Sequence, residues 1–167
     1  SYSHKDEAMA RELASRLRAA GQKVWIAADN IQPGEKWLAT IDRGLAESGI
    51  FIILLTPNSA ASKWVKHETE IAIQENVEGD MRILPLKLAA CHERDFLLAL
   101  KKYQFIDAVS NYEQGLQQLF DRLGIVDPQA EVRRLKAEVE SLKTQLALSL
   151  QEKGEAIAET KRIADEL

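Results

Sequence analysis

Short apolar runs alternate with amphipathic segments along the first 124 residues. The clearest run, Gly49 to Leu55, is followed by Thr56 and Pro57 and is typical of a buried parallel strand. Four shorter runs predict further strands at Ser1–Ser3, Lys23–Ile26, Arg82–Lys87 and Tyr103–Asp107. Because Pro85 has no backbone donor, we expect its strand at a sheet edge or a bulge.

Between these runs, apolar residues recur in steps of three and four, as they do on one face of a helix. Helices are expected at 10–20, 37–48, 59–77 and 116–123, with a short, ambiguous one around Phe96, Leu97 and Leu100. A glycine follows each long helix, and Ser59 or Ser62 can cap the third. The alternation predicts an α/β domain with a parallel sheet covered on both faces. In such sheets, ligands bind beyond the carboxyl ends of the strands.

One carboxylate falls on an apolar helix face. At 100° per residue from Trp64, Glu68 lies at about 40°, between Ile71 and Ala72. A carboxylate there loses hydration unless a partner compensates it. The alternative is that the side chain bends out to water or caps a backbone group. Glu75 lies in the same arc without any motif around it.

The composition changes after Asp127 and Pro128. Apolar residues then step 3-4-3-4 through Val132, Leu135, Val139, Leu142 and Leu146, which is a coiled-coil seam. The same register continues through polar residues such as Ser149 and Lys153, so the second half is a weaker seam or the register slips. A solvated single helix is the alternative. We expect a domain at 1–124, a linker at 125–130 and a coiled-coil helix at 131–167, within a longer protein whose first strand starts before Ser1.

Composition and charge narrow the classes of partner. The chain is 46% hydrophobic and 29% charged with a net charge of −4, and it has no basic footprint for nucleic acid or an anionic membrane. Its single cysteine, Cys91, excludes an internal disulfide and suits a reducing, cytoplasmic setting. No stretch approaches the roughly 18 apolar residues that a membrane span needs.

Several kinds of site are missing from the sequence. It has no glycine-rich phosphate loop, and His4, His67 and His92 stand apart, so no metal site is expected. A phosphoacceptor receiver domain shares this fold class. It would need an aspartate at the end of the third strand, where this chain has Leu54-Leu55-Thr56.

The combined pattern resembles a TIR (Toll/interleukin-1 receptor) domain of the NAD-cleaving prokaryotic type. The resemblance is carried by Ser1–Ser3, Val24–Ile26 with Asp29 and Pro33-Gly34, Ile41–Ser48, Ile50–Thr56 and Ser62–Glu68. The last segment has the Trp-x-x-x-Glu spacing of that branch. The resemblance implies a flavodoxin-like fold, a five-stranded parallel sheet with helices on both faces, over residues 1–124. It does not extend to the C-terminal helix.

The resemblance also implies an activity, the cleavage of NAD⁺ as a substrate with no separate cofactor. Glu68 is then the catalytic residue, because it matches the helix glutamate of the enzymatic members. Nicotinamide in NAD⁺ is already a cationic leaving group and needs no general acid. The ribose left behind becomes oxocarbenium-like, and one carboxylate can stabilise that charge. The products are nicotinamide and linear or cyclic ADP-ribose.

The resemblance assigns substrate-binding roles to Trp64, Trp37, His4, Lys5, Asp29 and Gly34. All of them except Gly34 have a structural alternative. Both tryptophans can be core residues, His4 and Lys5 can lie in a solvated loop, and Asp29 can cap its own turn.

Self-association is the remaining expectation. In the family, the BB loop, here with Ile31, Pro33 and Gly34, joins one TIR domain to the next, and a coiled coil would raise their local concentration. A role in innate immune or antiviral signalling, with a C-terminal sensor, fits this scheme. The competing hypothesis is a non-enzymatic TIR–TIR adaptor.

Overall fold

The computed structural model describes residues 1–167 except 27–28, 30–36, 78–80, 93–95, 97 and 166–167. The side chains of a few helical residues, Trp37 and Glu75 among them, also lie outside the description. The chain divides into two compact units, Ser1–Asp127 and Pro128–Leu167, and each is described by itself.

The described residues of the first unit form helices and three of the expected strands, in the predicted order. Its elements are η1 (His4–Asp6), α1 (Glu7–Ala19), α3 (Trp37–Ala46), β1 (Ile50–Leu55), α4 (Pro57–Ala61), α5 (Lys63–Val77), β2 (Arg82–Lys87), η3 (Leu98–Lys102), β3 (Ile106–Asp107) and α6 (Tyr112–Leu123). The second unit is the helix α7 (Pro128–Asp165), which begins inside the segment expected as a linker.

The sheet of the described residues has three parallel strands in the order β1-β2-β3. β1 pairs with β2 from Ile50↔Arg82 to Leu55↔Lys87, and β2 pairs with β3 at Leu86↔Ile106 and Lys87↔Asp107. The α/β class with a parallel sheet is thus confirmed. The expected five strands are not, because Ser1–Ser3 and Lys23–Ile26 are not strands here and the fifth is shortened to two residues.

Both of these segments nevertheless keep features of the expected strands. The Ser1 backbone nitrogen donates to the Ile52 carbonyl oxygen at 2.6 Å, and the Ser1 carbonyl accepts from the Leu54 N–H at 3.0 Å. This is parallel-strand pairing limited to one residue. Val24 and Trp25 pack against opposite core clusters, as successive residues of a strand do. The four-residue run Lys23–Ile26 was too short to predict a full ladder of hydrogen bonds.

The prediction for Pro85 is wrong, because β2 is the central strand. At both ends of β2, even-numbered residues donate toward β1, since the Arg82 N–H bonds the Gly49 carbonyl and the Leu88 N–H bonds the Leu55 carbonyl. The backbone N–H groups of the odd-numbered residues therefore point toward β3. β3 first pairs at Leu86, so Pro85 lacks its donor at a level where the short β3 has not begun.

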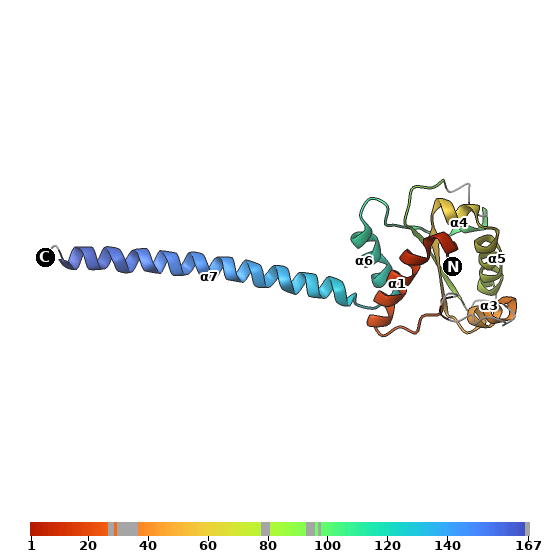
Figure 1. Ribbon diagram of the computed structural model, residues 1–167, viewed down its shortest axis with the longest axis horizontal. Helices are drawn as coiled ribbons and strands as arrows, with labels where there is room; N and C mark the ends of the chain where they lie inside the picture. Colours follow the sequence, from red (N-terminus) through yellow and green to blue (C-terminus); the bar gives the residue numbers. More distant parts are fainter. Residues whose placement is uncertain (27–28, 30–36, 78–80, 93–95, 97, 166–167) are drawn as a thin grey trace. The chain divides into compact units, whose positions relative to one another are not determined.

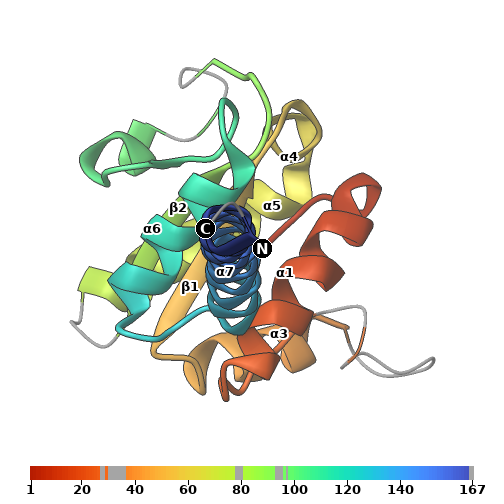
Figure 2. The ribbon, with the colours of Figure 1, turned by 90° about the vertical axis from the view of Figure 1, so that its left-hand side faces the viewer.

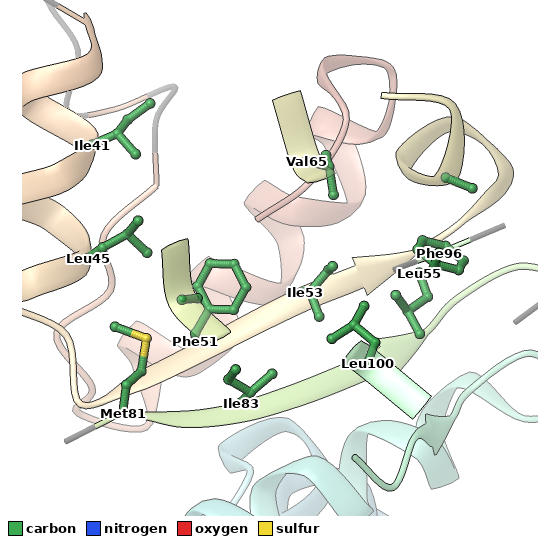
Figure 3. Packing of buried hydrophobic residues seen from close by; sticks show 12 residues of the cluster. Ile41, Leu45, Phe51, Ile53, Leu55, Val65, Met81, Ile83, Phe96 and Leu100 are labelled. Atoms are coloured by element: carbon green, nitrogen blue, oxygen red, sulfur yellow. The ribbon is translucent and has the colours of Figure 1, made fainter. Parts of the chain in front are cut away.

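Helices cover both faces of the sheet (Figures 1 and 2), and a hydrophobic cluster fills the space on each face. On one face, α1 and α6 bury Leu13, Leu17, Leu116, Leu119 and Phe120 against Leu54, Leu84, Leu86 and Ile106 of the strands. On the other face, Figure 3 shows Ile41, Leu45 and Val65 of α3 and α5 packed over Phe51, Ile53, Leu55 and Ile83. Alternate residues of β1 thus serve opposite clusters, which fixes its register.

The helix expected at 59–77 is divided into α4 and α5. Thr56 caps α4 through a capping box with Ser59, and Pro57 stands at its first turn. Ser62 is extended between the two helices, and its hydroxyl accepts from the Val65 N–H at 3.3 Å. Ser62 is therefore the cap of the helix that carries Glu68.

The helix α7 spans 38 residues and buries none of them. Among the described residues, no helix is both long and apolar enough to cross a membrane.

Candidate active site

Glu68 occupies the second turn of α5, on the side that faces the core. Val65 and Ala72 on this side are 1% and 0% exposed, and Glu68 itself is only 6% exposed. The prediction that Glu68 lies within the buried arc is confirmed. Moving a carboxylate from water to such a place is unfavourable unless it is hydrogen-bonded.

Two side chains supply those hydrogen bonds. The Trp64 indole Nε1–H donates to Glu68 Oε1 at 2.7 Å, and the Ser1 hydroxyl donates to Oε2. Trp64 and Glu68 are four residues apart, so they are neighbours on one helix face. The alternatives in which Glu68 bends out to water or caps a backbone group are therefore wrong.

This arrangement leaves the carboxylate fixed in orientation yet able to accept more hydrogen bonds. An indole N–H can only donate, so Oε1 must present a lone pair to it. An ionised carboxylate has about four lone-pair positions, and the two donors use one on each oxygen. The remaining positions can accept hydroxyl groups or stabilise a nearby positive charge.

The position of Ser1 depends on the sheet. Its backbone is bonded to Ile52 and Leu54 of β1, which places its hydroxyl against α5. Glu68 is thus held between its own helix and the chain beside β1. This contact joins residues 67 apart, so helical periodicity gave no signal for it.

Trp64 takes the packing role that the sequence offered for it, and its substrate-binding role remains a prediction. Its ring is half-buried and packs against the cluster under α3 and α5. The same ring donates to Glu68 and lies 5.9 Å from the His67 ring, measured between centroids and tilted by 58°. Packing orients the indole, and the indole orients the carboxylate.

A second buried carboxylate, which sequence reasoning missed, fixes the start of η1 and α1. Asp6 is 2% exposed and accepts from the Thr56 hydroxyl at 2.6 Å and from Asn58 Nδ2 at 2.7 Å. Thr56 directly follows β1, so Asp6 ties the His4–Asp6 turn to the carboxyl end of that strand. A polar residue that follows a strand at this edge was the available signal.

His4 and Lys5 are both exposed in η1, beside the buried Asp6. The structure places them at the carboxyl end of β1 through Asp6 and Thr56. No hydrogen bond or ion pair is assigned to either side chain in the described part of the chain, and their substrate role remains a prediction.

Asp29 bonds to helix α1. It accepts from Arg11 at 2.6 Å and from Arg18 at 2.9 Å. Hydrogen bonds from Arg18 and then Arg11 hold the pKa of the Asp29 carboxyl below its usual range. These contacts join Asp29 to α1, and its role in substrate binding remains a prediction.

Other predicted site residues lie outside the described residues. These are Ile31, Pro33 and Gly34 of the expected BB loop, together with the side chain of Trp37. Within the described ranges, no three His, Cys, Asp or Glu side chains group as metal ligands would.

A family model described as "TIR domain" matches residues 1–120. This chain belongs to the TIR-domain family. The TIR domain of the Toll-related receptor TRR-2 from Hydra magnipapillata superposes with a TM-score of 0.60 at 18% identity, covering 72% of this chain and 92% of that one. This likeness supports the fold alone.

Curated relatives of this TIR domain carry names of NAD⁺-cleaving enzymes. The NAD(+) hydrolase PdTIR of Paracoccus denitrificans is 35% identical over 74 residues, 44% of this chain and 25% of that protein. The probable 2′ cyclic ADP-D-ribose synthase TcpB of Brucella abortus is 31% identical over 80 residues, 48% of this chain and 32% of that protein. The matched segments thus span about a quarter to a third of these relatives.

Proposed function

We propose that this TIR domain is an NAD⁺ glycohydrolase that cleaves the bond between nicotinamide and ribose, with Glu68 as its catalytic residue. The observation that carries the proposal is the buried Glu68 carboxylate, held by one donor on each oxygen and able to accept more. The names of the relatives give the same class of reaction.

The chemistry needs little beyond a placed negative charge. Nicotinamide leaves as a neutral molecule, so no proton has to be supplied to it. The ribose carbon that loses it develops positive charge, as in glycoside cleavage. A carboxylate fixed beforehand stabilises that charge without reorganising, and its free lone pairs can accept the ribose hydroxyls.

The product depends on what attacks the ribose carbon. Water gives linear ADP-ribose, whereas a nucleophile from the same substrate molecule gives a cyclic product. Both outcomes occur among the names of the relatives, one a hydrolase and the other a probable cyclic ADP-ribose synthase. We propose that Trp64, Trp37, His4, Lys5, Asp29 and Gly34 bind the substrate, as the resemblance implies.

Activity depends on self-association in this proposal. Copies join through the BB loop and through α7, and the enzyme acts in the cytoplasm as part of immune or antiviral signalling. α7 supports the association because its apolar residues are exposed, including Leu142 at 57% and Leu146 at 61%.

A non-enzymatic adaptor is the second candidate. Such a module has no use for a buried carboxylate with paired donors, whose burial is costly. The arrangement around Glu68 therefore favours the enzyme.

The test is release of nicotinamide from NAD⁺, followed chromatographically so that linear and cyclic products separate. The full chain is assayed free in solution and clustered on beads. We expect nicotinamide release that rises on clustering. No release in either format would contradict the enzyme and favour the adaptor.

A further inference from the structure

The helix α7 exposes a continuous row of apolar side chains. Val132, Leu135 and Val139 are 47–49% exposed, and Leu142 and Leu146 are 57% and 61% exposed. No residue of α7 is buried. Most of a helix's stability in a protein comes from packing of such a face, so this row needs a partner.

We infer that the partner is the same row of a second copy of this chain, aligned in parallel and in register as a two-stranded coiled coil. The inference rests on the proposed self-association and specifies its partner, orientation and stoichiometry. It does not depend on NAD⁺ cleavage.

The residue types of the row select two parallel strands. A step of three runs from Val132 to Leu135 and a step of four from Leu135 to Val139. Val132 and Val139 therefore take heptad position a, Leu135 and Leu142 take position d, and Leu146 takes the third a position. β-branched residues at a with leucine at d favour parallel dimers over trimers or tetramers.

The charges that flank the row select the orientation. Glu131 and Glu138 occupy position g, and Lys136 and Lys143 occupy position e. In a parallel pair, each g residue faces the next e residue of the other copy, so Glu131 meets Lys136 and Glu138 meets Lys143. An antiparallel pair sets g against g and e against e, which brings glutamates together and lysines together.

The ion pairs within α7 do not prevent the formation of ion pairs between copies. Within the helix, Arg134 bonds Glu131 at 2.9 Å and Lys143 bonds Glu140 at 2.8 Å. All four side chains are more than 40% exposed, and such pairs contribute little stability. They can yield to pairs between copies.

The second half of α7 continues the row after one extra step of four. From Leu146 the row passes to Leu150 and then through Ile157 to Ala164, with polar Lys153 and Thr160 between them. A heptad row drifts by about 20° per repeat on a straight helix, and the extra step reverses that drift. The row therefore stays on one stripe of the helix.

Two hollows on the surface of α7 follow this stripe. One is lined by Val132, Leu135, Lys136, Val139, Glu140 and Lys143. The other is lined by Ala156, Ile157, Thr160, Lys161 and Ala164, which include Ile157 and Ala164 of the shifted row and Ala156 of the unshifted one.

A parallel pairing has a consequence for the first unit. Both copies of Pro128 lie at the same end of the paired helices, so both TIR units are attached at that end. Tethering of this kind gives effective concentrations that reach the millimolar range.

The first test measures the mass of the full chain by sedimentation across a dilution series. We expect a dimer for the wild type, and for Leu142→Glu a dissociation constant at least about 100-fold higher, because each copy loses a buried leucine. Leu148→Glu is the matched control, since Leu148 is equally exposed at 58% but is turned about 160° from Leu146. A monomeric wild type, a trimer, or equal effects of both variants would overturn the inference.

The second test addresses the orientation. Glu131→Lys with Glu138→Lys turns every g–e pair repulsive, so we expect weaker dimers by about 10- to 100-fold at low salt. Adding Lys136→Glu and Lys143→Glu to the same chain should restore the dimer. In a Cys91→Ala background, Val132→Cys should form an intermolecular disulfide, and Leu148→Cys should not. Failure of Val132→Cys to cross-link in a proven dimer would indicate an antiparallel pair.

Both tests read mass and cross-linking, so their outcome is separate from that of the proposed activity. A dimer without NAD⁺ cleavage would leave this inference standing and contradict the enzyme. NAD⁺ cleavage by a monomer would support the enzyme and contradict this inference.

Discussion

Replacing Arg16 by methionine should destabilise the first unit strongly. Arg16 lies on α1 and is 1% exposed. Its guanidinium bonds Asp127, which is also 1% exposed, and Glu113 at 3.2 and 3.0 Å. Burial by itself would lower the pKa of Arg16, but the hydrogen bonds to Glu113 and Asp127 outweigh it and raise that pKa. The ion pair closes a segment of more than one hundred residues.

The magnitude follows from the carboxylates that remain. Removing one partner of a buried ion pair costs about 3–5 kcal/mol, since the other charge stays buried. Glu113 is half exposed and regains water, so the lower end, about 3 kcal/mol, applies here. For a unit of this size, the corresponding fall in melting temperature is about 10 °C.

The assay is chemical and thermal unfolding of the wild type, Arg16→Met, Asp127→Asn and the double variant. We expect the double variant to recover at least half of the loss, because neutralising Asp127 removes the buried charge. Arg11→Met is the control on the same helix, since Arg11 also bonds two carboxylates but is 48% exposed, and its melting temperature should stay near that of the wild type. Strictly additive losses, or similar effects of Arg11→Met and Arg16→Met, would refute this reasoning.

Three further outcomes are expected. Trp64→Phe keeps a ring but removes the donor to Glu68, so the free energy of unfolding should fall by about 1–2 kcal/mol in denaturant titrations, and no loss would contradict the hydrogen bond. Burial, and after it Glu12, raises the pKa of Tyr112 from 10.0 to about 12, so the free energy of unfolding should fall as the pH rises between those two values. Tyr112→Phe should flatten that fall in melting experiments across pH, and an unchanged slope would show that Tyr112 is not its cause. Gly115→Ala would place a Cβ 2.3 Å from the Ala108 Cβ and should lower the free energy of unfolding by about 1–3 kcal/mol. Gly154→Ala meets nothing within 4 Å and should raise the helicity measured by circular dichroism. A stable Gly115→Ala together with a destabilised Gly154→Ala would contradict this packing.

The order of elements followed from local pattern, because buried strands and amphipathic helices differ in period. Pro85 was misplaced for a reason that lies outside its own strand: its missing donor matters only where β3 is present. Successive side chains of Lys23–Ile26 pack on opposite sides, as those of a strand do. A hydrogen-bonded ladder also requires a partner strand of matching length beside this segment. The break at Ser62 was missed because two consecutive caps looked like one helix start.

The site divided in the same way. Trp64 and Glu68 are four residues apart on one helix, so the spacing placed both on one face, but it did not predict the hydrogen bond between them. Ser1 reaches Glu68 across 67 residues and Asp6 reaches Thr56 across 50, and only the assembled sheet brings these pairs together. Asp29 bonds Arg11 and Arg18, which lie seven residues apart on one face of α1, and its loop sequence gave no signal for these ion pairs.

The most direct measurement compares NAD⁺ consumption by Glu68→Gln and Glu70→Gln with that of the wild type, each clustered on beads and checked by circular dichroism. Glu70 is exposed on the same helix, so it controls for the loss of a charge on α5. We expect Glu68→Gln to lose at least about 100-fold in rate, because a fixed charge at the reacting carbon is removed, and Glu70→Gln to keep the wild-type rate. Equal rates for all three proteins would contradict the central claim that the buried carboxylate of Glu68 performs the cleavage.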